Sequence, residues 1–135
     1  MQATIPESKS ETTRRRIVES AAHVLRNRGL SGTKLADIAA EAGIFAGSMY
    51  YHFKSKEHLV EVVMIEGMNR NTRYIRSKVK QLGARANPLA KLRAAIFAHV
   101  EYMLQGDDCS SAVARVFQDL PEDMRRRVTT KAYRS

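Results

Sequence analysis

The sequence contains no tryptophan, only three prolines, and Cys109 as its single cysteine among 135 residues. One cysteine excludes an internal disulfide, which fits a reducing compartment. No apolar run approaches the roughly 18 residues that a membrane-spanning helix needs. The N-terminal stretch, residues 1–11, is polar and lacks the apolar centre of a signal peptide. From these absences we expect a cytoplasmic protein with no membrane partner.

The motifs that usually accompany catalysis and metal binding are also missing. The chain has no nucleophile elbow, P-loop, dinucleotide-binding fingerprint or HExxH motif. Its four histidines, at positions 23, 52, 58 and 99, and its cysteine do not show the spacing of metal ligands. We therefore expect no enzymatic activity, no metal and no cofactor.

Positive charge dominates the composition. Lysine and arginine number 23 against 14 acidic residues, which gives a formal net charge of +9 at pH 7. Such a balance suits a polyanionic partner, because each phosphate that a basic side chain neutralises releases condensed counterions. An ordinary soluble basic protein can carry the same charge. Charge therefore favours nucleic acid without identifying it.

Apolar residues recur at three- and four-residue spacing along most of the chain, and no alternating stretch indicates a strand. The sequence therefore predicts an all-α fold. We expect a first helix over about 12–28, although Ser8 and Glu11 also have capping-box spacing. Thr33 is the expected N-cap of a second helix that ends at Gly43. A third, short helix is expected over about 46–52.

Caps and breakers also divide the rest of the chain. Ser55 is expected to cap a long fourth helix that ends near Gly83, and Asn87 with Pro88 begins a fifth helix that ends at Gly106. Apolar spacing predicts a sixth helix around 113–120 and a seventh from about 121. In the seventh helix, we expect three apolar side chains to face a segment that this chain lacks: Val128, Ala132 and Tyr133.

The segment from Thr33 to Lys56 predicts a helix-turn-helix. Its two short helices meet at Gly43, where Ala39 and Ala42 are small enough for close approach. In such a motif the second helix enters the major groove of DNA. The pattern alone is only moderately specific, because helical hairpins with a glycine turn are common.

The residues that follow carry a closer resemblance. The stretch GSMYYHF at 47–53, followed by SKE at 55–57, resembles the signature of the TetR/AcrR family of bacterial regulators. The preceding DIA at 37–39 and AGI at 42–44 resemble the entry to the family's helix-turn-helix, and the similarity covers about residues 12–65. The resemblance implies a DNA-binding transcriptional regulator, in most cases a repressor that a small-molecule effector releases from a palindromic operator in double-stranded DNA. It also implies a homodimer in the full-length protein.

Hydroxyl, imidazole and ammonium groups around the third helix are suitable donors to phosphate oxygens. Gly47 allows the backbone to approach the duplex closely, and Ser48 can donate to a base or a phosphate. We assign Met49 and Phe53 to the core, while a Tyr-Tyr pair is commonly half-buried. The start of the first helix, at Arg14 to Arg16, is either near DNA or a solvated face. The candidate DNA-binding residues are Thr33 and Lys34, which the family resemblance alone implies, together with Phe45, Ala46, Gly47, Ser48, Tyr50, Tyr51, His52, Lys54 and Lys56.

Phe45 departs from the family pattern, which usually has serine or threonine just before the recognition helix. Phenylalanine cannot cap a helix, and the missing cap costs about 1 kcal/mol. An aromatic ring in this position can instead contact a thymine methyl group in the major groove. The operator sequence therefore cannot be transferred from relatives.

Beyond the headpiece, the resemblance implies helices that enclose a small-molecule pocket, followed by two helices that form the dimer. The chain is shorter than usual for the family, and we interpret it as about the first two-thirds of a regulator. For any single one of these residues, ordinary core packing is the more common explanation. The candidate effector-binding residues are Ile96, Phe97, His99, Val100, Met103, Val113 and Phe117.

The sequence thus predicts three parts. Residues 1–11 form a flexible tail, residues 12–57 a helix-turn-helix domain, and residues 58–135 a linker helix with an incomplete ligand-binding and dimerisation domain. The alternative hypothesis is a ligand-independent basic protein of the nucleoid-associated type. In that protein the positive charge would provide the DNA affinity, and the C-terminal helices would only pack.

Overall fold

The computed structural model describes residues 6–134, in which the regular elements are helices joined by loops and turns and no strand occurs. The elements are α1 (Lys9–Arg28), α2 (Leu35–Ala42), α3 (Ala46–His52), α4 (Lys56–Gln81), α5 (Pro88–Gln105), α6 (Asp108–Val116), a 3₁₀ turn η1 (Phe117–Asp119) and α7 (Glu122–Arg134). The all-α prediction is confirmed. Residues 1–5 of the expected tail lie outside the described residues.

Helix α1 begins earlier than the periodicity predicted. The Ser8 hydroxyl accepts a hydrogen bond from the backbone N–H of Glu11 at 3.2 Å, and the Glu11 carboxylate accepts one from the N–H of Ser8 at 2.8 Å. This reciprocal capping box satisfies two N–H groups at the helix start. The helix therefore starts at Lys9, not at Thr12, and part of the expected tail is helical.

The expected cap of α2 is wrong. Thr33 is fully buried, and its hydroxyl donates to the backbone carbonyl oxygen of Gly29 at 2.6 Å instead of accepting from α2. Gly29 ends α1 with a positive φ of 74°, which turns the chain back so that the Thr33 hydroxyl meets that carbonyl. The N-cap position of α2 falls on Lys34, whose side chain makes no capping hydrogen bond.

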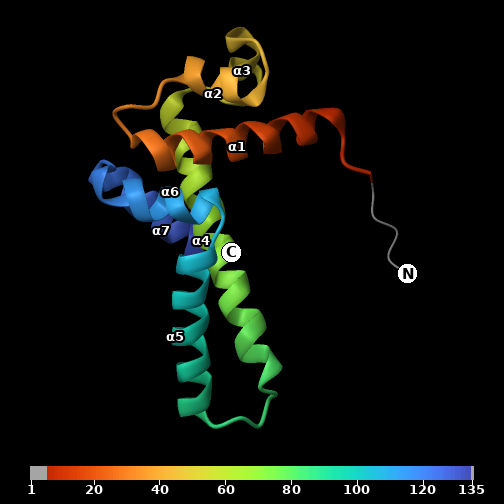
Figure 1. The fold of residues 1–135 in the computed structure, drawn as a ribbon, viewed down its shortest axis with the longest axis vertical. Coiled ribbons are helices and arrows are strands. Elements are labelled where there is room, and N and C mark those ends of the chain that lie inside the picture. The colour runs from red at the N-terminus through yellow and green to blue at the C-terminus, as the bar shows by residue number, and fades with distance from the viewer. Residues whose placement is uncertain (1–5, 135) are drawn as a thin grey trace.

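The predicted caps of α4 and α5 are confirmed. The Ser55 hydroxyl accepts from the N–H of His58 at 3.1 Å, and the Asn87 side chain accepts from the N–H of Leu89 at 2.8 Å, with Pro88 opening the helix. The C-terminal half of α4 and the whole of α5 form an antiparallel pair that projects away from the other helices (Figure 1). We call this pair the arm.

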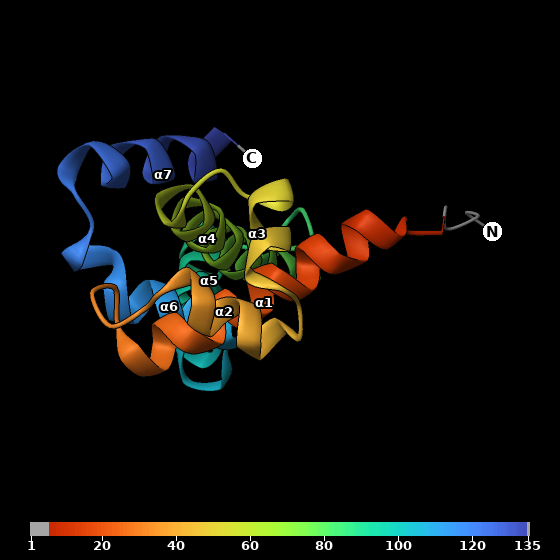
Figure 2. The same ribbon diagram turned by 90° about the horizontal axis from the view of Figure 1, so that it is seen from above.

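The core lies where α1, α4 and α6 meet, and α7 closes its other side. In Figure 2, α4 is seen along its axis, with α7 on one side and α1 and α6 on the other. Val128 of α7 is fully buried in this core. The expectation that Val128 would face an absent segment is therefore wrong, because α7 packs on α4, whereas Tyr133 at the end of α7 is exposed.

None of the helices in residues 6–134 is long and apolar enough to span a membrane.

Candidate nucleic-acid interface

The turn between α2 and α3 sets the position of the recognition helix. Gly43 has φ 66° and ψ 38°, the left-handed conformation that favours glycine, and its N–H donates to carbonyl oxygens at the end of α2. Met49 and Phe53 are buried, which fixes the inner side of α3 against the headpiece core. The remaining side of α3 lies at the end of the molecule opposite the arm tip (Figure 1).

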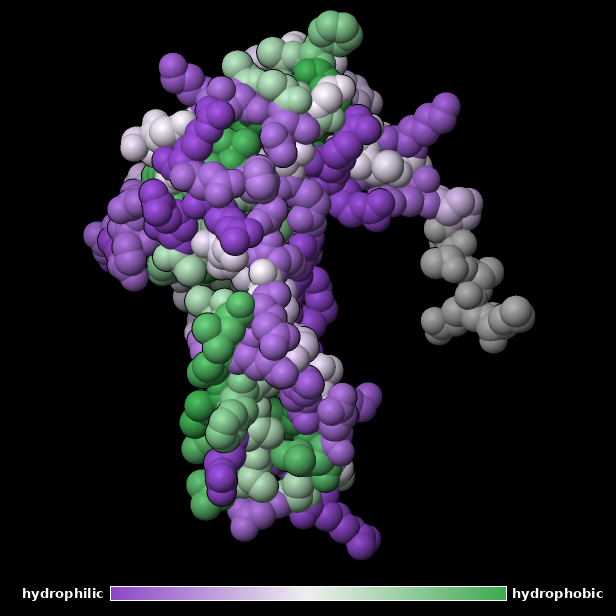
Figure 3. All heavy atoms as spheres, viewed as in Figure 1, coloured by the Kyte–Doolittle hydropathy of each residue, from purple (hydrophilic) through white to green (hydrophobic). Residues whose placement is uncertain are grey.

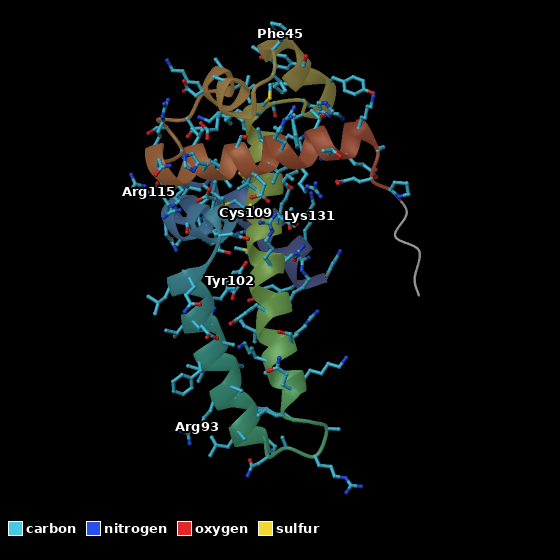
Figure 4. The ribbon with its side chains drawn as sticks, turned by 45° about the vertical axis from the view of Figure 1, so that its right-hand side comes forward. Phe45, Arg93, Tyr102, Cys109, Arg115 and Lys131 are labelled. Carbon is cyan, nitrogen blue, oxygen red and sulfur yellow. The ribbon has the colours of Figure 1, made fainter. Side chains whose placement is uncertain are left out.

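Large aromatic side chains occupy this outer side. Phe45 is 87% exposed, Tyr51 81% and Tyr50 63%, so neither tyrosine belongs to the core. Figure 4 shows Phe45 at the extreme tip of the headpiece. Eight of the predicted DNA-binding residues are exposed on the headpiece: Lys34, Phe45, Ala46, Gly47, Ser48, Tyr50, Tyr51 and Lys54.

His52 and Arg14 link the end of α3 to α1. The guanidinium of Arg14 donates to the backbone carbonyl oxygen of His52 at 2.7 Å and lies 4.2 Å from the centre of the Phe53 ring. The half-buried His52 ring packs edge-on against Tyr51, with centroids 5.0 Å apart. Arg14 therefore holds α3 in place from inside the headpiece, a role that the sequence did not distinguish from a solvated or DNA-facing one.

Two predicted contact residues are engaged within the protein. Thr33 is fully buried, so its side chain cannot reach DNA in this conformation, because the hydroxyl is committed to Gly29. The half-buried Lys56 donates its ammonium to the carbonyl oxygen of Leu30 at 2.8 Å. Lys56 thereby ties the start of α4 to the loop between α1 and α2.

The candidate effector residues do not form the single cavity that was expected. Five of them lie on the exposed side of α5: Ile96, Phe97, His99, Val100 and Met103. Val113 instead packs beside Gly67 between α4 and α6. Phe117 lines a cavity of about 380 Å³, together with Met68, Asn71, Thr72, Thr129, Ala132 and Tyr133. In the described residues α5 turns its large side chains away from α4, and effector binding by these residues stays a prediction.

A charged cluster that the sequence analysis missed connects the headpiece to the later helices. Arg70 of α4 donates to Glu66 at 2.7 Å and to Asp107, the N-cap of α6, at 2.6 Å. It also pairs with Glu19 of α1. Partial burial acts to lower the pKa of Arg70, but the hydrogen bonds that its guanidinium donates to Glu19, Asp107 and Glu66 outweigh this effect and raise that pKa. We call these four residues the Arg70 clamp.

A second ion pair lies beside the Arg70 clamp. Asp108, the first residue of α6, accepts from Arg26 of α1 at 2.6 Å and lies 3.2 Å from the Nδ1 atom of His23. The hydrogen bond from Arg26 is the main cause that holds the pKa of Asp108 below its ordinary value. The start of α6 is thus attached to α1 by charged groups at two adjacent positions. Within residues 6–134, no group of three or more His, Cys, Asp or Glu side chains could hold a metal ion.

The geometry is that of a helix-turn-helix DNA-binding headpiece whose recognition helix is α3. Residues 17–63 match the family model described as bacterial regulatory proteins, tetR family. The segment that holds the helix-turn-helix therefore belongs to this family of bacterial regulatory proteins.

Relatives with curated names and solved structures are similar over most of this chain. The transcriptional repressor KstR2 of Mycolicibacterium smegmatis is 32% identical over 128 residues, covering 87% of this chain and 58% of KstR2. The structure of KstR2 of Mycobacterium tuberculosis has a TM-score of 0.72 at 27% identity and covers 98% of this chain and 64% of that one. AibR, solved with isovaleryl coenzyme A and operator DNA, has a TM-score of 0.75 at 25% identity and covers 90% of this chain and 65% of AibR. The chain spans about three-fifths of the length of these proteins.

Proposed function

We propose that the protein is a sequence-specific DNA-binding repressor of transcription, without enzymatic activity, that acts on DNA in the bacterial cytoplasm. The observation that carries the proposal is the exposed outer side of α3, where aromatic, small and basic residues gather on a helix-turn-helix. The description of KstR2 as a transcriptional repressor and the operator DNA in the AibR structure support it.

In this proposal α3 enters the major groove. Ser48 and the backbone at Gly47 face the base edges, while Tyr50, Tyr51 and Lys54 donate to phosphate oxygens on the flanking strand. Lys34, exposed at the start of α2, neutralises a further phosphate. Thr33 and Lys56 support the headpiece from within, as their internal hydrogen bonds indicate.

The full-length protein would bind a palindrome as a homodimer, with recognition helices one DNA turn, about 34 Å, apart. An effector would bind in the cavity beside Phe117, where Met68 and Ala132 provide apolar walls and Asn71 and Thr129 provide polar partners. An occupied cavity would shift α7 and η1 relative to α4, and so change the spacing of the two headpieces. AibR, whose structure holds isovaleryl coenzyme A together with operator DNA, supports this proposal of effector binding.

A binding titration tests the function directly. The 135-residue chain and a full-length version should each be titrated with an operator selected from random DNA and with unselected DNA of equal length, at several salt concentrations. Specific repression requires the full-length protein to prefer the selected operator by at least about 10³-fold. Equal affinity for both DNAs would favour the ligand-independent, nucleoid-associated alternative, for which the net charge of +9 is the argument.

We expect Lys54→Ala to weaken binding to selected and unselected DNA by the same factor. The exposed ammonium beside α3 contacts a phosphate in this proposal, so its loss should lower the slope of log K against log salt by roughly 1. Lys80→Ala is the matched control, because Lys80 is an exposed lysine at the far end of α4. A salt slope that is the same for both variants would contradict the role of Lys54.

We expect Phe45→Ser to change both stability and sequence preference. Phe45 occupies the N-cap position of α3 without a capping hydrogen bond, so a serine that reaches an N–H of α3 should add about 0.5–1 kcal/mol of stability. Removal of the ring should also relax the preference for thymine at the base pair that it contacts. Selection of operators from random DNA with each variant measures this, and identical selected sequences would exclude Phe45 from base recognition.

A further inference from the structure

The recognition helix α3 has little structure of its own to hold it in place. It is seven residues long, its N-cap residue Phe45 makes no capping hydrogen bond, and Met49 is the buried residue of the helix. Helices this short are not stable by themselves in water, because the ordering of the first turn costs more than a few hydrogen bonds return. The orientation of α3 therefore depends on the groups that attach it to the rest of the headpiece.

One side chain reaches the backbone of α3 from another helix. Within residues 6–134, the hydrogen bond that a side chain outside α3 donates to its backbone is the one from the Arg14 guanidinium to the carbonyl oxygen of His52, at 2.7 Å. The acceptor is the last residue of α3, where carbonyl groups lack partners within the helix and where the helix dipole favours a cation. Arg14 thus caps the C-terminal end of the recognition helix from α1.

The same guanidinium also fixes the residue that follows α3. Its central carbon lies 4.2 Å from the centre of the Phe53 ring, and Phe53 is 1% exposed. A cation over an aromatic face is attracted by the quadrupole of the ring, more strongly where water is excluded. Arg14 is half-buried and forms no ion pair with another described residue, whereas its exposed neighbour Arg15 pairs with Glu7 at 2.8 Å. Among these residues, no carboxylate competes with His52 for the Arg14 guanidinium.

The end of α1 that carries Arg14 is hydrophilic. Helix α1 extends past the other helices of the headpiece toward the N-terminus (Figure 2). Hydrophilic side chains cover most of that end, whereas apolar side chains gather at the tip of the headpiece (Figure 3). The first four residues of α1, Lys9 to Thr12, are all exposed. The attachment of α3 to this end of α1 therefore depends on the polar contact from Arg14.

We propose that Arg14 is a positioning residue that fixes the angle at which α3 meets the major groove, and so determines how well the protein distinguishes its operator from other DNA. Base edges must lie within hydrogen-bond distance of the side chains that read them, so a loosened α3 would lose these contacts first. Phosphate contacts from the flexible side chains of Lys34 and Lys54 tolerate a small shift of the helix. The step from α3 to DNA rests on the proposed function, whereas the attachment of α3 by Arg14 does not.

Hydrogen exchange of the 135-residue chain without DNA tests the attachment. Arg14→Met keeps the length of the side chain and removes the donor. We expect the amides of Tyr51, His52 and Phe53 to exchange at least about 10-fold faster in this variant, because a hydrogen bond from a charged group is lost. Arg14→Lys, which retains a cation and a donor, should restore most of the protection. Arg16→Met, which removes an exposed arginine of the same helix, should leave exchange in α3 unchanged. Unchanged exchange in Arg14→Met, or faster exchange spread evenly over α1 and α4, would overturn the proposal.

DNA binding by the full-length version tests the consequence. We expect Arg14→Met to lower the preference for the selected operator over unselected DNA by about 10-fold or more. The affinity for unselected DNA, and its slope of log K against log salt, should stay unchanged. Arg76→Met, which removes an exposed arginine of the arm, is the control and should bind both DNAs as the parent does.

A phosphate contact by Arg14 would give a different result. Arg14→Met would then weaken binding to both DNAs equally and lower the salt slope by roughly 1, and the proposal would be wrong. A parent protein without operator preference would contradict the proposed function instead. In that case the hydrogen-exchange result would still decide whether Arg14 holds α3.

Discussion

Replacement of Gly67 by alanine is expected to destabilise the protein by about 3 kcal/mol, because it adds a methyl group where none fits. Gly67 lies on α4 against α6, and a Cβ there would lie 2.6 Å from the backbone carbonyl oxygen of Cys109 and 2.7 Å from the Cγ2 atom of Val113. The Cys109 backbone cannot rotate away as a flexible side chain could, so α6 must move as a whole. Since α6 also packs on α1, the displacement would reach the headpiece.

The sign of the stability change on Gly67→Ala distinguishes a packing effect from an effect of helix propensity. Alanine in place of glycine inside a helix normally stabilises it by up to about 1 kcal/mol. Gly47→Ala is the matched control, because Gly47 is also helical and a Cβ there would meet nothing within 4 Å. Urea unfolding should show a loss for Gly67→Ala and no loss for Gly47→Ala. A Gly67→Ala variant as stable as the parent chain would show that α4 and α6 are not in close contact.

The helix order and most helix ends were predictable because they depend on local chemistry. Ser55 and Asn87 cap their helices through hydrogen bonds to residues two or three positions later, and Gly43 ends α2 through its own backbone conformation. Thr33 misled the prediction because its hydroxyl has two possible partners. The carbonyl oxygen of Gly29 lies within reach of that hydroxyl because the loop between α1 and α2 folds back.

The candidate site was less predictable than the helix ends, because it depends on contacts between residues that are far apart in the sequence. Arg14 contacts His52 over 38 positions and Lys56 contacts Leu30 over 26. No motif marks Arg14, and the motif that contains Lys56 indicated a contact with DNA and not this internal hydrogen bond. The motif did locate α3, but the exposure of Tyr50 and Tyr51 followed only from the burial of Met49 on the other side of the same helix.

Which side of α5 is buried could not be predicted from its apolar periodicity. Its apolar periodicity was recognised and was assigned to the interior, as is usual for an amphipathic helix. The structure reverses that assignment, because α4 packs against the alanine side and leaves Ile96 and Phe97 exposed. Periodicity identifies an apolar face, but the partner that covers it is determined by the rest of the fold.

Replacement of Arg70 by glutamine is expected to lower the free energy of unfolding by about 2–4 kcal/mol. The Arg70 side chain is only 22% exposed, and its removal would take away the cation that the carboxylates of Glu19, Glu66 and Asp107 share. Glu66 alone would keep a second partner, the exposed Arg73. Because these carboxylates belong to α1, α4 and the cap of α6, their repulsion would loosen the attachment of α6 to the headpiece.

Arg73→Gln is the control for this variant. Arg73 lies on the same helix and pairs with Glu66 at 3.3 Å, but its side chain is 63% exposed, so its removal should cost at most about 1 kcal/mol. Hydrogen exchange should also show faster opening of α6 in Arg70→Gln than in Arg73→Gln. Equal losses of unfolding free energy for the two variants would mean that the Arg70 clamp stabilises the fold no more than a surface ion pair does.

The pH dependence gives an independent check on the same residue. Partial burial of Asp107 opposes ionisation, but the hydrogen bonds from Arg70 and from the N–H of Ser110 prevail and hold the pKa of Asp107 below its ordinary 3.8. A carboxyl group with a lowered pKa in the folded state stabilises the fold above its unfolded pKa, and this stabilisation is lost as the pH falls through the folded-state value. The stability difference between the parent chain and Arg70→Gln should therefore be full at pH 7 and shrink below about pH 4. If unfolding measurements from pH 7 to pH 3 gave a constant difference, Arg70 would stabilise the protein through packing of its side chain and not through the carboxylates around it.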